Sequence, residues 1–207
     1  MKKEKLTILL LIVIGFVSLS LKGQSIKDFY IPLNYNKANF YKPDKSGERS
    51  DFTRVIEYHN NEDGSYSIYS EFTFKGDLVS KNIERIIFTT NSVIRTKSIF
   101  NSAFGGGDRE QTYNPAQIIL KMPAKGQTVV WSIPNEPESI YTASWTNIIV
   151  EGKSKRAIKV SNIVKRWKSK TVSYYVQGIG LMNTNLVHAN GEIKPFEIFD
   201  GLSNSEN

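Results

Sequence analysis

The sequence predicts a mainly β protein, built as a single curved antiparallel sheet or half-barrel with little helix. From Asp51 onward, apolar and aromatic residues alternate with polar ones in short runs, the period of a half-buried strand. Turn-forming pairs such as Asp-Gly, Lys-Gly and Asn-Gly separate these runs. The chain has no internal repeat and no long helical period. Closely spaced strands joined by short turns favour an antiparallel all-β fold.

Residues 1–24 have the features of a secretory signal peptide. Three lysines within the first five residues precede an apolar run from Leu6 to Leu21. A membrane anchor is the alternative, because the run approaches the roughly 20 residues that span a bilayer. The small and polar residues at its end favour cleavage between Ser20 and Ser25. We therefore expect an exported protein, in the periplasm or outside the cell.

The absence of cysteine narrows both the chemistry and the means of stabilisation. A lipid-anchored lipoprotein, a thiol nucleophile and disulfides are excluded, so the fold must rest on its hydrophobic core. Residues 25–202 suit one antiparallel β domain, and we expect the polar tail 203–207 to be disordered. The formal charge of +7 falls to about +4 without the signal peptide, which is weak grounds for a polyanionic partner. Nucleic acid is not expected as the partner of an exported chain.

The elements follow in order. Residues 25–47 contain two prolines and scattered aromatic residues without a clean period, and predict an irregular segment lying across the core. Alternation over Asp51–His59 and Tyr66–Phe74, with Asp63-Gly64 between them, predicts a β-hairpin. Further β-rich runs predict strands at 83–90, 93–100, 118–122, 128–133, 139–150, 156–167 and 172–181. A short hairpin around Asn190-Gly191 and an apolar patch at Phe196, Ile198 and Phe199 complete the pattern.

The run from Val172 to Leu181 organises this prediction. In one continuous strand, Tyr174 shares a face with Gly178 and Gly180, so that face loses its side chains abruptly. A glycine pair of this kind marks a bend, a bulge or a group lying directly on the backbone. We expect the cover to be an aromatic ring or the segment Phe196–Phe199. The motif residues are Tyr174, Tyr175, Gly178, Gly180 and Leu181.

With Trp131 after Lys-Gly and the hairpin Tyr141–Val160, this motif resembles exported bacterial proteins of the TapB-like domain-of-unknown-function group. Members of that group characteristically end in a Tyr-x-x-Gly-[Val/Ile]-Gly-Leu strand. The resemblance covers about the last third of this chain. The resemblance implies a curved antiparallel half-barrel similar to the LolA and LolB lipoprotein carriers, with no established activity. This chain departs from the pattern by continuing some two dozen residues past Leu181, enough to cover the open side of a half-barrel.

Candidate catalytic and metal-binding residues are scarce, and we predict neither a catalytic site, a cofactor nor a metal. A three-histidine zinc site is impossible, because only His59 and His188 are present. A site with both histidines would need Glu57 or Glu192 to converge with them. Residues Gly105–Asp108 precede a strand instead of the helix that a phosphate loop needs, so a hairpin loop is the better interpretation.

The densest positive charge lies in the hairpin from Lys153 to Lys170. Alternation places Lys159, Lys165 and Trp167 on one face of its second strand. This face is either a solvated outer surface that discourages aggregation at a sheet edge or a contact surface for an anionic partner, with Trp167 as an interfacial anchor.

These observations favour a non-enzymatic binding module of the bacterial cell envelope. The expected partner is a lipid or other hydrophobic ligand, or an envelope protein, and contact with a membrane surface is compatible with the basic face. An accessory subunit of an envelope assembly and a cryptic hydrolase are the alternatives. A concave face lined by Phe, Tyr, Ile and Val with an open mouth would favour a further rival, a lipid or lipoprotein carrier, and an exposed apolar rim would favour the assembly subunit.

Overall fold

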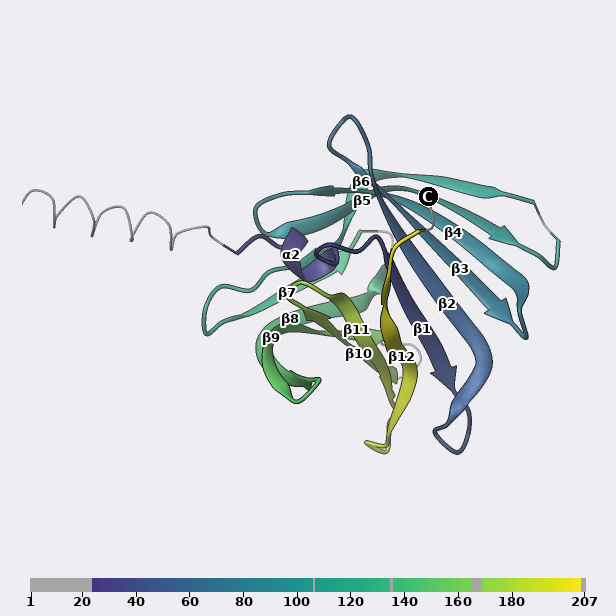
Figure 1. Ribbon diagram of the computed structural model, residues 1–207. Coiled ribbons are helices and arrows are strands. Elements are labelled where there is room, and N and C mark those ends of the chain that lie inside the picture. The colour runs from purple at the N-terminus through teal and green to yellow at the C-terminus, as the bar shows by residue number, and fades with distance from the viewer. Residues whose placement is uncertain (1–23, 106, 135, 165–168, 206–207) are drawn as a thin grey trace, which may run out of the picture.

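The structure is a computed structural model that describes residues 24–105, 107–134, 136–164 and 169–205. The predicted signal peptide lies outside the described residues except for Gln24. Within them, the prediction of a single curved antiparallel sheet with little helix is confirmed. Twelve strands form one sheet that curls almost into a closed barrel (Figure 1).

The described elements are one helical turn and twelve strands, more strands than the sequence predicted. They are α2 (Lys27–Tyr30), β1 (Lys37–Pro43), β2 (Arg49–Asn60), β3 (Tyr66–Phe74), β4 (Asp77–Phe88), β5 (Ser92–Ser102), β6 (Arg109–Lys121), β7 (Thr128–Ile133), β8 (Glu136–Val150), β9 (Lys153–Val164), β10 (Ser169–Val176), β11 (Gly180–Val187) and β12 (Ile193–Ser203). No helix in this part of the chain is long and apolar enough to cross a membrane.

The topology is an up-and-down meander. Apart from β6 and β7, strands that are neighbours in sequence pair antiparallel, and β12 returns to pair with β1. Between β6 and β7, the described residues form no backbone ladder. At this seam, the Trp131 indole Nε1 donates to the Ile118 carbonyl oxygen (2.9 Å), and the Trp145 indole donates to the Pro123 carbonyl (2.9 Å). Trp131 therefore links the two edge strands, and Trp145 links β8 to the loop that follows β6.

A meander of this kind sorts its turns to two ends of the barrel. The turns β2–β3, β4–β5 and β10–β11 lie at one end with α2, which we call the α2 end. The turns β1–β2, β3–β4, β5–β6 and β11–β12 lie at the other end, which we call the mouth. Figure 1 shows α2 between the β6 and β7 sides of the sheet.

The strand period decides which side chains fill the barrel. In β2, Ile56 and Tyr58 point inward and are buried, and their cross-strand partners Ser70 and Ile68 on β3 are buried with them. Phe29 of α2 inserts among these residues and meets the Trp145 ring at 5.3 Å in an edge-to-face contact. The core therefore gathers at the α2 end, where Phe29 and Ile26 are fully buried.

The predicted continuous strand from Val172 to Leu181 is wrong. It is a hairpin in which β10 ends at Val176, residues 177–179 turn, and β11 begins at Gly180. Gly178 and Gly180 have positive φ of 78° and 87°, a region that glycine adopts without steric cost. The glycines thus mark a reversal of the chain instead of a bare strand face.

The cover over these glycines is the N-terminal segment and not Phe196–Phe199. The Gly178 N–H donates to the Asp28 carbonyl (2.7 Å), and its carbonyl accepts from the Leu33 N–H (3.0 Å). A Cβ atom at Gly180 would lie 2.8 Å from the Tyr30 carbonyl oxygen. The prediction of a group lying directly on the backbone is therefore confirmed, with a different segment as the group.

Both ends of the predicted β domain enter the sheet further than predicted. The expected irregular segment 25–47 contains β1, which fills the place between β2 and β12. The C-terminal residues do not cover the barrel but form its last strand, and Ser203 belongs to β12. The disordered tail predicted from Ser203 is wrong for its first residues, because Asn204 and Ser205 hydrogen-bond to Asn36. Residues 206 and 207 lie outside the described part.

Candidate ligand-binding cavity

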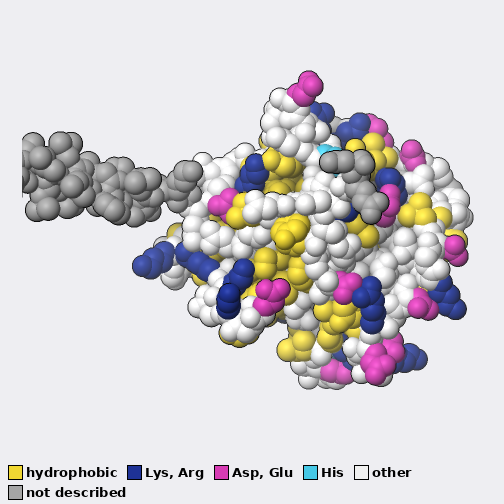
Figure 2. Space-filling view, in the orientation of Figure 1, with side chains coloured by type: hydrophobic (Ala, Val, Ile, Leu, Met, Phe, Trp, Pro, Cys, Tyr) yellow, Lys and Arg dark blue, Asp and Glu magenta, His cyan; other side chains and the backbone are white. Residues whose placement is uncertain are grey.

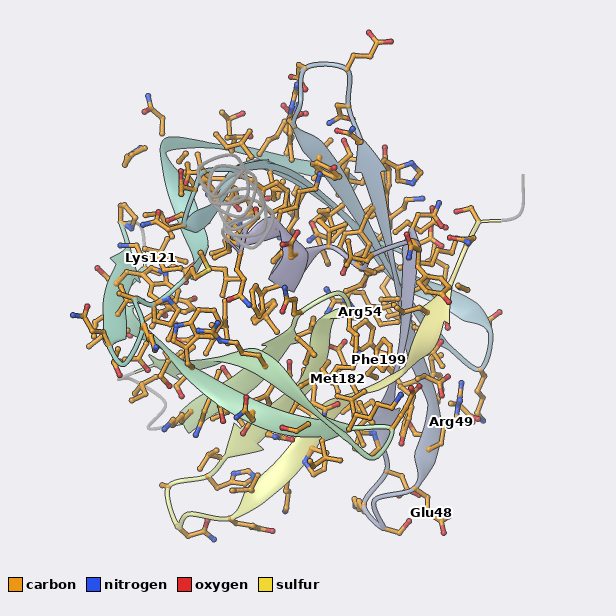
Figure 3. All side chains as sticks on the ribbon, turned by 60° about the vertical axis from the view of Figure 1, so that its left-hand side comes forward. Glu48, Arg49, Arg54, Lys121, Met182 and Phe199 are labelled. Carbon is orange, nitrogen blue, oxygen red and sulfur yellow. The ribbon has the colours of Figure 1, made fainter. Side chains whose placement is uncertain are left out.

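The barrel interior is packed at the α2 end and hollow toward the mouth. Two adjacent chambers of about 310 and 330 Å³ occupy this hollow. They share the lining residues Arg54, Phe196 and Glu197. Figure 3 shows Arg54 and Phe199 in the interior of the molecule, whereas Glu48 and Arg49 lie at its periphery. Together the chambers have the size of an ordinary small-molecule pocket, about 300–1,000 Å³.

The first, which we call the aromatic chamber, lies at the mouth. It is lined by Tyr41, Lys42, Phe52, Thr53, Arg54, Phe72, Ser80, Phe100, Phe196 and Glu197. Phe100 and Phe196 are 43% and 48% exposed, so apolar surface of this chamber reaches solvent. The exposed Lys42 ammonium lies 5.3 Å from the centre of the Phe196 ring, an attractive cation–π distance. The chamber is thus an apolar pocket whose outer rings reach the surface.

The second, which we call the polar chamber, lies between the aromatic chamber and α2. It is lined by Tyr30, Arg54, Ile56, Tyr58, Ile68, Glu84, Arg95, Ile119, Ser173, Tyr175, Leu181, Thr184, Phe196 and Glu197. These residues come from α2 and from strands on both sides of the barrel, β2–β6 and β10–β12. Apolar and hydrogen-bonding groups therefore face each other across one interior space.

The chambers meet at an ion pair between β2 and β12. Arg54 Nη1 donates to both carboxylate oxygens of Glu197, at 3.1 and 3.0 Å, and Nη2 donates to the Ser70 hydroxyl at 3.2 Å. Arg54 Nε is buried and has no hydrogen-bond partner among the described residues. A buried donor without a partner costs about 1–3 kcal/mol. Because this atom has almost no accessible surface, the neighbouring side chains close it off from both chambers.

A second ion pair lies on the opposite wall of the polar chamber. Arg95 Nη1 donates to Glu84 at 2.5 Å, and its Nε and Nη2 donate to the Gln117 side-chain oxygen. The arginine side chain is 20% exposed and the glutamate 16%. Burial lowers the pKa of Arg95, but the Glu84 carboxylate outweighs this and raises it. With two arginines and two glutamates as its charged residues, the polar chamber is balanced in charge.

Three tyrosines make the rest of this chamber a neutral hydrogen-bonding surface. The rings of Tyr30 and Tyr175 stack at 5.9 Å, and Tyr58 is buried behind them. Removal from solvent raises the pKa of Tyr175 to about 12 and also raises the pKa of Tyr30 and Tyr58. The phenols therefore stay protonated at neutral pH and can both donate and accept hydrogen bonds.

Some of the predicted motif residues line the polar chamber, and others hold the turn between β10 and β11. Tyr175 and Leu181 line the polar chamber. Gly178 and Gly180 hold the turn against the N-terminal segment. Tyr174 pairs with Lys159 across β10 and β9 and is half-buried. Tyr175 thus reaches the cavity by the ordinary alternation of β10, which it shares with Ser173, and the register shift in β11 sets Leu181 opposite it.

The proposed basic face is described only in part, since Lys165 and Trp167 lie outside the described residues. Lys159 is half-exposed on β9, whereas its neighbours Ile158 and Val160 point inward and are buried. Ser161, which shares the face of Lys159 by strand alternation, is buried. Figure 2 shows positive and negative side chains interspersed over the face that it presents.

The two histidines lie at opposite ends of the barrel. His59 ends β2 on the outer face, with its Nε2 3.1 Å from the Glu57 carboxylate, and His188 precedes β12 in a turn at the mouth. Their places in the sheet keep them from sharing one site. Within the described residues, no group of three or more His, Asp or Glu side chains could hold a metal ion.

The residues that sequence reasoning missed are the four charges of the polar chamber. Arg54 lies on the inward face of β2. The sequence shows it as a charged residue between the apolar Phe52 and Ile56 of the same face. Glu197 is 143 residues away, and no spacing rule joins the two.

A search with the chain finds no matching family model, no matching curated protein and no matching solved structure.

Proposed function

We propose that this protein binds a small amphipathic molecule inside its barrel, as a carrier or binding protein and not as an enzyme. The single observation that carries the proposal is the pair of adjoining chambers, one aromatic and one polar, within one interior space. The apolar part of the ligand lies among the phenylalanine rings, and its polar part lies beside Arg54 and Glu197. Ligand sites are typically apolar with a few placed polar groups, and this cavity has that composition.

The mouth supports access to the cavity. Phe74, Phe100 and Phe196 are each between 43% and 48% exposed near the outer end of the aromatic chamber. Exposed aromatic residues around a pocket commonly mark a binding surface. A ligand that enters there meets apolar surface first and the ion pair afterwards. An exported carrier, with LolA- and LolB-like architecture as the sequence resemblance implies, is the role that fits such a cavity.

The test is binding of N-phenyl-1-naphthylamine, a neutral apolar dye that fluoresces when it leaves water. We expect saturable binding to the purified mature protein. Ser80 lines the aromatic chamber, so Ser80→Trp should fill the chamber and reduce dye affinity at least tenfold. Asn101→Trp is the matched control, because Asn101 lies on the outer face of the adjacent strand β5. Unsaturable dye uptake, or equal loss in both variants, would contradict the proposal.

An accessory subunit of an envelope assembly is the second candidate. Phe104, in the loop between β5 and β6, is 84% exposed, and single exposed rings of this kind serve as anchors in protein interfaces. This role predicts a protein complex that Phe104→Ser disrupts while dye binding is unchanged. Size-exclusion chromatography of envelope extracts that contain either the parent or Phe104→Ser measures this. A complex that is present with the parent and absent with the variant separates this role from the first.

A further inference from the structure

The charges of the polar chamber limit the class of ligand. Arg54 is already neutralised by Glu197, and Arg95 by Glu84, at 3.0 and 2.5 Å. Both pairs are largely enclosed, with side-chain exposures between 11% and 22%. An ionised head group placed here would add an uncompensated charge to a poorly solvated site, which is strongly unfavourable. A neutral head group avoids this penalty.

The hydroxyl groups of the polar chamber add a second constraint. Tyr30, Tyr58 and Tyr175 line this chamber, and each phenol carries an O–H donor. A head group that accepts a hydrogen bond can pair with these donors, whereas a hydrocarbon end cannot. The chamber therefore favours a head group with an exposed oxygen acceptor.

The order of the chambers fixes the orientation of the ligand. The aromatic chamber is the outer one, with Phe100 and Phe196 reaching solvent, and the charged pairs lie deeper. A fatty acid with its carboxylate near Lys42 at the mouth would push its chain end against Arg54 and Glu197. The inverse orientation puts the head at the ion pair and the chain among the rings, which matches each part of the ligand to its surroundings.

We propose that the ligand is a neutral single-chain amphiphile whose head carries a carbonyl acceptor, an ester or an amide, with the head at Arg54 and the chain in the aromatic chamber. This inference rests on the proposed function. The two head-group sources share one chemistry, a carbonyl oxygen without a formal charge. A free fatty acid with the same chain length as such an ester or amide should bind more weakly.

The experiment compares displacement of the bound dye by decanoate, by its glycerol monoester and by its N-methyl amide, at a pH well above the carboxyl pKa. The unmodified protein should bind both neutral compounds at least tenfold more tightly than decanoate. Tighter binding by one of the two neutral compounds identifies the ester or the amide as the source. Decanoate binding as tightly as both would overturn the inference and leave the proposed function standing. No displacement and no dye binding would overturn both.

A charge variant makes the test sharper. Glu197→Gln removes the negative partner and leaves Arg54 with a free positive charge. The ratio of the affinity for the neutral compounds to the affinity for decanoate should therefore fall at least tenfold. Asp200→Asn is the matched control, because Asp200 also lies on β12 and pairs with an arginine, Arg49 at 2.7 Å, but outside the cavity. It should leave the preference unchanged. An unchanged preference in Glu197→Gln would contradict the role of the pair, and the comparison in the unmodified protein stands even if this variant does not fold.

Discussion

The Trp131 indole of β7 donates a 2.9 Å hydrogen bond to the Ile118 carbonyl oxygen of β6. It does so at the seam where the described strands lack a backbone ladder. The ring also stacks on Tyr141 at 5.4 Å, so it is held on its own side of the seam while its N–H reaches across. The barrel is thus held nearly closed by side chains where the backbone pairing stops.

Trp131→Phe removes this bond and keeps an aromatic ring. We expect a loss of about 1 kcal/mol in the free energy of unfolding, the usual net worth of one hydrogen bond. Because the bond acts locally, amide hydrogen exchange should accelerate in β6 and β7 more than in β2 and β3. Uniform acceleration over all strands would show that Trp131 supports the whole core instead of the seam.

The turn that joins β10 to β11 gives a second prediction. Gly180→Ala should lower the free energy of unfolding by about 2–4 kcal/mol, through its positive φ and a collision with the Tyr30 carbonyl oxygen at 2.8 Å. Gly191→Ala is the control, since Gly191 has a similar φ of 84° but open space around it. Urea unfolding of both measures the collision alone as the difference between them. Equal losses would show that the N-terminal segment moves aside without cost.

The ion pair between Arg54 and Glu197 should add little to the free energy of unfolding as a whole, whereas the loss of one partner alone should lower it markedly. Glu197→Leu alone leaves Arg54 with an uncompensated charge and should cost about 3 kcal/mol. Arg54→Met alone should also be destabilising, because it leaves the Glu197 carboxylate enclosed without its cation. The double variant should be roughly as stable as the parent. Thermal unfolding of all four proteins checks this, and additive losses in the double variant would contradict it.

Buried tyrosines predict a loss of stability in alkali. The pKa of Tyr175 rises to about 12 through burial, against about 10 in an unfolded chain. Its neutral form therefore stabilises the fold fully below pH 10, and that contribution is lost as the pH rises to 12. The urea midpoint of the parent should not depend on pH near neutrality and should fall between pH 10 and 12, and Tyr175→Phe should flatten this fall. An identical alkaline decline in both proteins would rule Tyr175 out as a cause.

The strand period predicted from the sequence succeeded where one face is buried and the other solvated. The hairpin of β2 and β3 and the bounds of β7 follow this rule. The period missed the first half of β6, Arg109–Pro115, because there both faces are largely exposed and no apolar residues alternate. It also missed β1 as a strand, since Lys37–Pro43 ends in a proline and pairs on one side with β12, whose residues are far away in the sequence.

The cavity was less accessible from the sequence, for a physical reason. A glycine pair signals special backbone conformation but not whether the chain bends or reverses, so Gly178 and Gly180 were placed in one strand instead of a turn. Arg54 stood out on an inward face, yet its partner Glu197 lies on a strand that closes the barrel from the other end of the chain. Only the closure of β12 on β1 brings these charges together.

The central claim is that the ligand lies inside the barrel among the rings of the aromatic chamber. The most direct measurement is an isotope-filtered nuclear Overhauser spectrum of labelled protein with bound, unlabelled N-phenyl-1-naphthylamine. We predict contacts from the dye to the ring protons of Phe52, Phe72 and Phe100. Contacts confined to Tyr69, Ile83 and Ile99, which line pockets on the outer face, would contradict the claim.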